Sequence, residues 1–506
     1  MPEPPPHSAA RPSRSPGNRV FWGNLARYTL ALLSVACGAA AFAVIFRHAI
    51  SWVFVHVFEA PDVLSAFQVL PWYARILVPA LGGGLAGSLG ALSLKLKGGH
   101  GVGDVMEAVA LGRRRISLGP TLLKALGSWC AIVAGGSVGR EGPLIQFGGG
   151  LGSELGRLFR LRERQVRGLI AAGAAAGFAA AYNTPIAAVL FVVEVVTGVI
   201  ALDIVLPAII AVPIATALTR LAIGGGPIYG QRSFSMSSNA EFAAYAALGL
   251  LSGIAGPLFM RLLSAGETLF AKLTSQRALR AALGGALVGV MAIQRPEVTG
   301  NGYEAINLIL NQRLTVSLVI VLLFAKALAT TASVSSGSPG GVFTPSLFLG
   351  AALGGTVGHV VLRISPSTAG GAVEAYALVG MAAMTAATTH APLMASVLVF
   401  ELSGDYAIAL PLLSATAIAT LLSRRIHRES IYTEELRRRG RRWQIKVVSD
   451  EDLLTTPPAP LKGSPAAPSS EPTIPRSATL RCAAGARAPT LVRRESRGRR
   501  RRKRLL

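Results

Sequence analysis

The stretch GGSVGREGPLIQFGGG at residues 135–150 stands out in a chain that is otherwise strongly apolar. Within it, Arg140 and Glu141 lie side by side among glycines, directly before an apolar helical segment. Ionisable side chains are costly at membrane depth, so their presence there indicates an ion or proton pathway. The glycines leave backbone N–H groups unobstructed, and the positive end of the following helix points towards them. This combination suits a partly dehydrated anion.

The composition is typical of a membrane protein. Of the 506 residues, 51% are hydrophobic and only 15% are charged, whereas roughly 25% are charged in a soluble protein. Apolar runs that approach the roughly 20 residues needed to span a bilayer recur along the chain. They lie at 28–46, 76–94, 169–193, 200–218, 242–260, 314–332 and 407–422. We therefore expect ten or more membrane helices, some of them tilted, re-entrant or broken by glycine.

The net charge of +25 does not indicate nucleic-acid binding, because the basic clusters lie outside the apolar runs. Lys and Arg residues next to spans favour the cytoplasmic side, so we predict that both termini are cytoplasmic. The first twenty residues have no apolar core, and no cleavable signal peptide is expected. The three cysteines form no CxxC pair, so no disulfide framework is predicted. No metal site or cofactor is predicted either.

Three regions are predicted along the chain. Residues 1–20 are a basic, disordered leader, and residues 21–446 are the membrane unit. Residues 447–506 form a Pro-, Ser- and Arg-rich tail that cannot bury enough apolar surface to fold. We expect this tail to be a solvated cytoplasmic extension whose arginines touch anionic lipid headgroups and not nucleic acid.

The membrane unit contains an internal duplication. Two segments that begin with KAL start 202 residues apart, at Lys124 and Lys326. The segment GAAAGFAAAYNTPIAAVLFVVE at 173–194 aligns without a gap with GMAAMTAATTHAPLMASVLVFE at 380–401. Duplicated membrane halves pack around a pseudo-twofold axis, with the substrate site near the midplane where broken helices meet. The predicted repeat halves cover roughly 25–225 and 235–435.

Glu141 is the candidate gate in the first half. Its carboxylate would lie where an anion would otherwise bind at the helix start, and would therefore compete with the anion. Protonation would release the carboxyl group and give a gate that senses pH and voltage. Gly139, Arg140 and Gly142 are the predicted anion-binding residues beside it, although a structural pairing role is the favoured interpretation of Arg140.

The second half has a matching glycine-rich helix start, GSPGGVFTP at 337–345. It also carries an early proline, which is tolerated there because the first turn has no backbone donor to lose. We expect the backbone at Gly341, Val342 and Phe343 to face the same ion. One such helix start is weak evidence, but two at matching places in a duplicated membrane unit are much stronger.

These motifs resemble those of the CLC family of chloride channels and proton/chloride antiporters. The similarity rests on GSVGREGP, GSPGGVFTP and the NTP…E and HAP…E segments, and it extends over about residues 25–440. The segment NGYEAINLIL at 301–310 is closest to the bacterial ClcB-like branch. The resemblance implies an all-α polytopic fold with two inverted-topology repeats of tilted and broken helices. It also implies a homodimer in the bacterial inner membrane, with one chloride path per subunit.

The resemblance also implies roles for individual residues. Glu141 matches the gating glutamate, and residues 340–345 match the second filter helix start. Tyr432, within SIYTEELRRRG, matches a tyrosine whose hydroxyl donates to the central anion. The family's cytoplasmic nucleotide-sensing modules are not expected here, because nothing that resembles a folded domain follows Trp443.

Two departures from the family pattern affect the predicted function. His100 stands in place of the serine that contacts the central anion, and Gly103 in place of the following proline. We predict that His100 contacts the anion, and the order of anion selectivity stays open. Val195 stands where antiporters carry their inner proton-relay glutamate, and valine cannot carry a proton. This favours passive conduction.

The favoured hypothesis is therefore a voltage- or pH-gated anion channel, and the alternative is a proton/chloride antiporter on the same scaffold. We expect Glu194 and Glu401 to cap helices or form pairs inside the bundle. A third hypothesis is an intramembrane serine protease that uses Ser137 or Ser338 with His390. The repeat accounts for these three residues without catalysis, so no enzyme is predicted. A structural scaffold would not explain Glu141.

Overall fold

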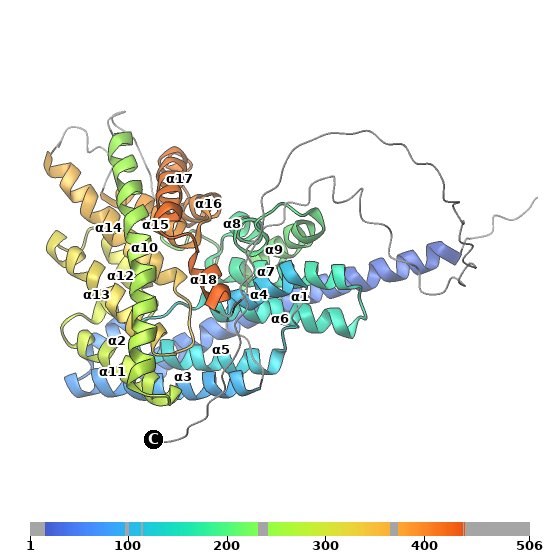
Figure 1. The fold of residues 1–506 in the computed structure, drawn as a ribbon, viewed down its shortest axis with the longest axis horizontal. Coiled ribbons are helices and arrows are strands. Elements are labelled where there is room, and N and C mark those ends of the chain that lie inside the picture. Colours follow the sequence, from blue (N-terminus) through green and yellow to red (C-terminus); the bar gives the residue numbers. More distant parts are fainter. Residues whose placement is uncertain are drawn as a thin grey trace, which may run out of the picture. The chain divides into compact units, whose positions relative to one another are not determined.

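The computed structural model describes residues 16–96, 101–112, 115–230, 241–364, 373–438 and 440. These residues are almost entirely helical and contain no strand, which confirms the predicted all-α fold (Figure 1). Helix α1 already begins at Pro16, within the predicted leader. The predicted tail at 447–506 and the candidate residue His100 lie outside the described residues.

The first half of the membrane unit runs from α1 to α9. Its elements are α1 (Pro16–His56), α2 (Val63–Val69), α3 (Trp72–Lys95), α4 (Val102–Leu111), α5 (Leu118–Val133), α6 (Glu141–Leu158), α7 (Glu163–Tyr182), α8 (Pro185–Phe191), the π-helical η1 (Val192–Thr197) and α9 (Leu202–Ile223).

The second half repeats this series. Its elements are α10 (Glu241–Leu273), α11 (Arg277–Gln294), the short 3-10 helix η2 (Pro296–Val298), α12 (Tyr303–Leu310), α13 (Val316–Ser335), α14 (Phe343–Ile364), α15 (Val373–Thr389), α16 (Pro392–Ser403), α17 (Ala409–Ile426) and α18 (Ile431–Arg438).

The packing of the helices shows the duplication. Helix α1 packs on α7 and α9 in the first half, and α10 packs on α15 and α17 in the second. Likewise, α6 packs on α7 and α3 on α5, as α14 packs on α15 and α11 on α13. The two halves meet where α3 lies along α11 and where α8 contacts α16. The fold thus consists of the two repeats of tilted and broken helices that the sequence predicts.

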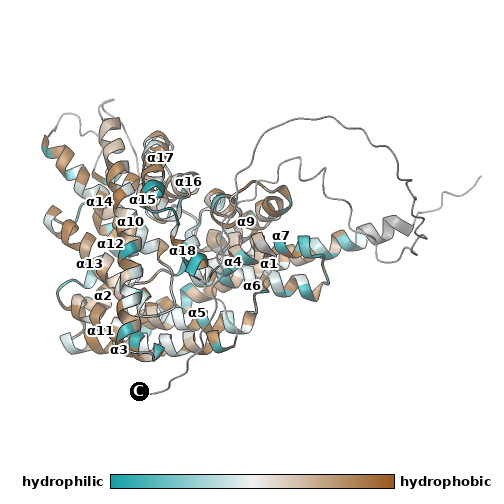
Figure 2. Cartoon of the chain, viewed as in Figure 1, coloured by the Kyte–Doolittle hydropathy of each residue, from teal (hydrophilic) through white to brown (hydrophobic). Residues whose placement is uncertain are grey.

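Seven helices among the described residues are long and apolar enough to cross a membrane by length and composition. Figure 2 shows the apolar character of the longest helices along most of their length. Three further apolar helices have only 10–17 residues, at Leu118–Val133, Pro185–Thr197 and Pro392–Ser403. The seven long and three shorter apolar helices make ten candidates, in line with the expectation of ten or more membrane helices, some of them broken. Breaks such as those before Pro185 and Pro392 shorten the helices that follow.

The breaks fall at matching places in the two halves. Helices α7 and α15 are directly followed by Asn183 and His390, which have φ angles of 57° and 60°. This left-handed conformation ends a helix, and few residues other than glycine and asparagine adopt it readily. Pro185 and Pro392 then start α8 and α16, because proline is favoured in the first turn.

Candidate anion site

The two glycine-rich helix starts meet in an isolated antiparallel bridge between Gly139 and Gly341. The Gly139 N–H group donates to the Gly341 carbonyl oxygen at 2.7 Å, and the Gly341 N–H group donates to the Gly139 carbonyl oxygen at 2.9 Å. Gly142 lies beside this bridge, because a Cβ atom added to it would be 3.6 Å from the Gly341 nitrogen. Segments from the two repeats thus form one structural unit.

The Glu141 side chain crosses from the first repeat to the start of α14 in the second. Its Oε1 atom accepts hydrogen bonds from the backbone N–H groups of Phe343 at 2.9 Å and Thr344 at 3.3 Å. Its Oε2 atom accepts one from the Thr344 hydroxyl at 2.9 Å. The first N–H groups of a helix have no partner within the helix and carry partial positive charge. They therefore hold a carboxylate here, and the side chain of Glu141 is only 1% exposed.

Glycine at both ends of the bridge leaves space for this carboxylate, and a larger residue at either end would displace it. A Cβ atom at Gly139 would collide with both carboxylate oxygens of Glu141, and a Cβ atom at Gly341 would collide with Oε1. The glycines in the two motifs therefore make room for a negatively charged group of this size between the repeats.

An aromatic wall surrounds the same helix start. The Tyr182 hydroxyl lies 2.7 Å from the Thr344 hydroxyl oxygen, which in turn bonds Glu141. The Phe343 ring is edge-on to Phe178, with 5.5 Å between the ring centroids. Thr344 lies within the predicted filter helix start at 340–345, whereas Tyr182 lies outside every predicted site segment. The only available signal was that Tyr182 directly precedes the NTP segment, at the end of α7.

A cavity of about 930 Å³ extends from Glu141 and Gly142, and its wall includes Val342 and Tyr432. Tyr432 is 7% exposed and its ring stands edge-on to Phe191, with 6.5 Å between centroids. The structure thus places Tyr432 and Glu141 on the wall of one cavity. The same wall carries charged side chains of both signs from several elements. The basic ones are Lys124, Lys272, Arg277, Arg280 and Arg438, and the acidic ones besides Glu141 are Glu267, Glu434 and Glu435.

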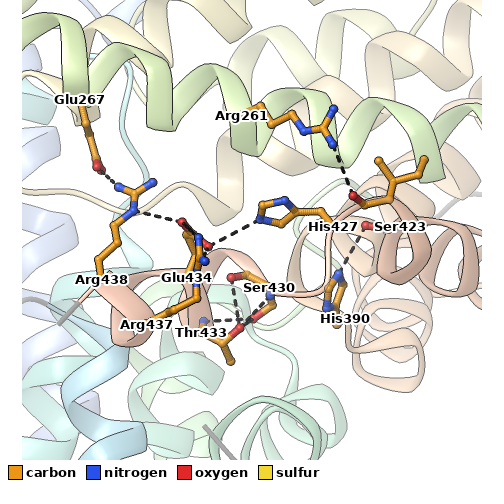
Figure 3. A network of polar contacts seen from close by, with 11 residues as sticks. Arg261, Glu267, His390, Ser423, His427, Ser430, Thr433, Glu434, Arg437 and Arg438 are labelled. Atoms are coloured by element: carbon orange, nitrogen blue, oxygen red, sulfur yellow. Dashed lines mark hydrogen bonds and ion pairs between the residues drawn. The ribbon is translucent and has the colours of Figure 1, made fainter. Parts of the chain in front are cut away.

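An ion-pair network fixes α18 beside this cavity (Figure 3). Glu434 accepts from the guanidinium groups of Arg437 at 3.0 Å and Arg438 at 3.2 Å, and lies 3.7 Å from the His427 ring nitrogen. Arg438 also pairs with Glu267 on α10. These contacts tie the helix that carries Tyr432 to the long helix α10.

Not every predicted site residue lies beside Glu141 and the large cavity. Arg140 lines a different, smaller cavity, and its Nη2 atom donates to the carbonyl oxygen of Ala181 at 3.3 Å. Its side chain is therefore separated from the carboxylate of the neighbouring Glu141, which lines the large cavity. His100 cannot be placed, since it is outside the described residues.

The protease hypothesis is not supported by the position of its histidine. The Nε2 atom of His390 lies 3.4 Å from the hydroxyl of Ser423, and that hydroxyl donates to the Ala387 carbonyl oxygen at 2.6 Å. The Ser137 hydroxyl is 2.9 Å from the hydroxyl of Thr330. Among the residues that the structure covers, neither Ser137 nor Ser338 forms a hydrogen bond with His390.

Comparison with known sequences gives a consistent result. The family model described as "Voltage gated chloride channel" matches residues 82–424. A ClcB-like chloride channel protein of Ralstonia nicotianae is 39% identical over 400 residues, which covers 78% of this chain and 91% of that protein. A voltage-gated ClC-type chloride channel, ClcB, of Salmonella dublin is 35% identical over 395 residues, which covers 77% of this chain and 94% of that protein.

Solved structures share the fold. A slow cyanobacterial Cl−/H+ antiporter superposes with a TM-score of 0.75 at 25% identity, over 82% of this chain and 98% of that one. A CLC-type fluoride/proton antiporter superposes with a TM-score of 0.65 at 22% identity, again over 82% of this chain and 98% of that one. With its two repeats joined at a buried carboxylate on a helix start, this chain belongs to the CLC family of voltage-gated chloride channels and transporters.

Proposed function

We propose that this chain is a gated channel that conducts chloride passively, with Glu141 as the gate. The observation that carries the proposal is the position of the Glu141 carboxylate on the N–H groups of Phe343 and Thr344. Because those groups bind one negative charge, a chloride ion can replace the carboxylate only when the side chain leaves. The carboxylate and the ion therefore exclude each other at the start of α14.

The large cavity gives the proposed ion a route to this point. Its volume of about 930 Å³ has room for hydrated ions, and both Glu141 and Tyr432 line it. In the proposed path, Gly139, Gly142, Gly341, Val342 and Phe343 surround the ion with backbone, and Tyr432 faces it from the cavity.

Val195 supports a channel over an antiporter. It lies in η1, is 5% exposed and has no group that could carry a proton. The second candidate, a proton/chloride antiporter, is favoured by the similarity to the cyanobacterial Cl−/H+ antiporter. Glu141 can take part in either mechanism, because an acidic group that competes with chloride can also exchange a proton.

The reversal potential separates the two candidates. The purified chain would be reconstituted into planar bilayers with a tenfold chloride gradient and, in a second series, an added proton gradient. A chloride channel reverses near the chloride equilibrium potential, about 59 mV for a monovalent ion, and the proton gradient leaves this value unchanged. A reproducible shift of the reversal potential with the proton gradient would establish the antiporter and refute the channel.

We also propose that the chain is a homodimer in the bacterial inner membrane, with both termini in the cytoplasm. Its support is the family membership and the exposed apolar side chains on adjoining helices, such as Ile186 on α8 and Leu393 on α16. Light scattering in detergent should give a protein mass of twice 52.5 kDa. A protein mass of one chain would contradict the homodimer.

A further inference from the structure

A second cavity, of about 160 Å³, lies on the side of Arg140. We call it the Arg47 cavity. Its polar lining consists of Arg47, Ser51, Asp62, Arg140, Asn301, Tyr303 and Glu304. Arg140 lines this cavity and the next residue, Glu141, lines the large one. The two cavities are therefore lined by consecutive residues, directly after the Gly139–Gly341 bridge between the repeats.

Arg47 is unusual among the charged side chains of the protein. It lies in α1, within an apolar span, and is half-buried. Among the described residues it makes no hydrogen bond and no ion pair, although its guanidinium group and that of Arg140 are close enough to repel each other. A positive charge in such a position is costly unless an anion or water compensates it. The Arg47 guanidinium group, together with the N–H groups of Arg140 that do not bond Ala181, thus provides donors for the cavity.

The acidic side chains of the Arg47 cavity offset this charge only in part. The Asp62 carboxylate accepts a hydrogen bond from the Ser65 N–H group at 2.8 Å and caps α2. Burial raises the pKa of Glu304, so this carboxyl group offsets the arginine charge less fully than an exposed carboxylate would. No carboxylate lies within ion-pair distance of Arg47 or Arg140 in the described part of the chain.

The wall of the Arg47 cavity is held by contacts that do not involve the two arginines. The hydroxyl of Tyr303 donates to the Ile228 carbonyl oxygen, and its ring stacks on Tyr229 with 5.2 Å between centroids. Lys326 donates to the carbonyl oxygens of Val298 at 2.8 Å and Gly300 at 2.9 Å, directly before Asn301. The cavity is therefore preformed, and removing the Arg47 charge leaves these contacts in place.

We propose that the Arg47 cavity binds a small monovalent anion before it enters the path, at the end of the path opposite the large cavity. This inference rests on the proposed anion conduction and adds a site and a residue, Arg47, to it. Guanidinium groups, a hydroxyl and a side-chain amide are donors that suit chloride or nitrate. The volume equals that of about five water molecules at roughly 30 Å³ each, so it admits an ion with part of its hydration shell.

The test measures how the current saturates with chloride when chloride is varied on one side of a planar bilayer at a time. Arg47→Met should raise the half-saturating concentration about three- to tenfold from the side of the Arg47 cavity, the effect expected for one nearby charge. From the side of the large cavity it should change nothing. Arg47→Lys keeps the charge and should stay within about twofold of wild type. Arg27→Met, which removes an exposed arginine from the same helix, is the matched control and should behave as wild type.

Glu304→Gln provides a second test, in which the half-saturating chloride concentration should change in the opposite direction to that in Arg47→Met. This test does not depend on the stability of the Arg47 variants. Removing a negative charge from the cavity should lower the half-saturating concentration on the same side only. Unchanged saturation in a monodisperse Arg47→Met variant, or in Glu304→Gln, would overturn the proposed anion binding in the Arg47 cavity. Failure of the channel proposal would look different. The wild-type current would then depend on the proton gradient, but Arg47→Met would still raise the half-saturating chloride concentration from one side only.

Discussion

Glu194 and Glu401 cap each other's helices across the two repeats. The Glu194 carboxylate, in the first half, accepts from the N–H groups of Leu393 at 3.2 Å and Met394 at 2.7 Å at the start of α16. The Glu401 carboxylate, on α16 itself, accepts from the N–H groups of Ile186 at 3.0 Å and Ala187 at 2.8 Å at the start of α8. The expectation that these glutamates cap helices inside the bundle is confirmed.

This reciprocal capping predicts a loss of stability without a loss of gating. Glu194→Ala and Glu401→Ala should each reduce the free energy of unfolding by about 1–2 kcal/mol, because two N–H groups at a helix start lose their acceptor. The measurement is unfolding in mixed detergent micelles, with Glu154→Ala as control. Glu154 forms only a surface ion pair with Arg157, and such pairs contribute little. Equal stability of all three variants would contradict the capping account.

The position of Glu141 predicts the pH dependence of chloride flux. A protonated carboxyl group binds the helix start more weakly than a carboxylate, so flux through the wild type should rise as the pH falls. Glu141→Ala and Glu141→Gln carry no charge on this side chain at any pH and should conduct equally at acidic and at neutral pH. Chloride efflux from liposomes is the measurement. Variants that kept the pH dependence of wild type would show that another group is the gate.

Thr344 predicts a shift in that pH dependence. Its hydroxyl stabilises the seated carboxylate, and a hydrogen bond to a charged group contributes about 1.5–3 kcal/mol. In Thr344→Val, flux should therefore reach half its maximum at a pH about one unit or more above that of wild type, because less proton binding is needed to release the carboxyl group. Tyr182→Phe is the control, since Tyr182 contacts Thr344 and not Glu141, and it should shift the midpoint less. Identical midpoints for wild type and Thr344→Val would contradict this role.

Gly341 predicts a steric effect on the same gate. The methyl group of Gly341→Ala would occupy the place of the Glu141 Oε1 atom and should prevent the carboxylate from seating. The ratio of flux at low pH to flux at high pH should then fall towards one. Gly119→Ala is a matched control, because nothing lies within 4 Å of a Cβ atom added there. If the ratio of low-pH to high-pH flux in Gly341→Ala equalled that of wild type, the gating carboxylate would have to bind elsewhere.

The repeat and the filter segments were predictable from the sequence, because the same motifs recur in order at nearly constant spacing. The pairing of Gly139 with Gly341 and the capping by Glu194 and Glu401 follow from that symmetry. The exact positions of the helix breaks were not predictable, because apolar composition alone does not reveal where a helix breaks, and three of the apolar helices have only 10–17 residues.

Other features depended on contacts between distant segments. Arg47 and Glu304 lie on α1 and α12, and no sequence spacing indicates that they line one cavity. The same holds for the contact of Tyr182 with Thr344, which joins α7 to α14. Arg140 and Glu141 are neighbours in sequence, yet they line different cavities, because the chain enters α6 between them.

The central claim is that the Glu141 carboxylate and the conducted anion occupy the same place. Crystals of Glu141→Ala grown in bromide, measured at the bromine absorption edge, test it most directly. We predict an anomalous peak within hydrogen-bond distance of the Phe343 and Thr344 N–H groups, where Glu141 Oε1 lies in the wild type. Bromide bound elsewhere in the membrane unit, with no peak at the start of α14, would contradict the account.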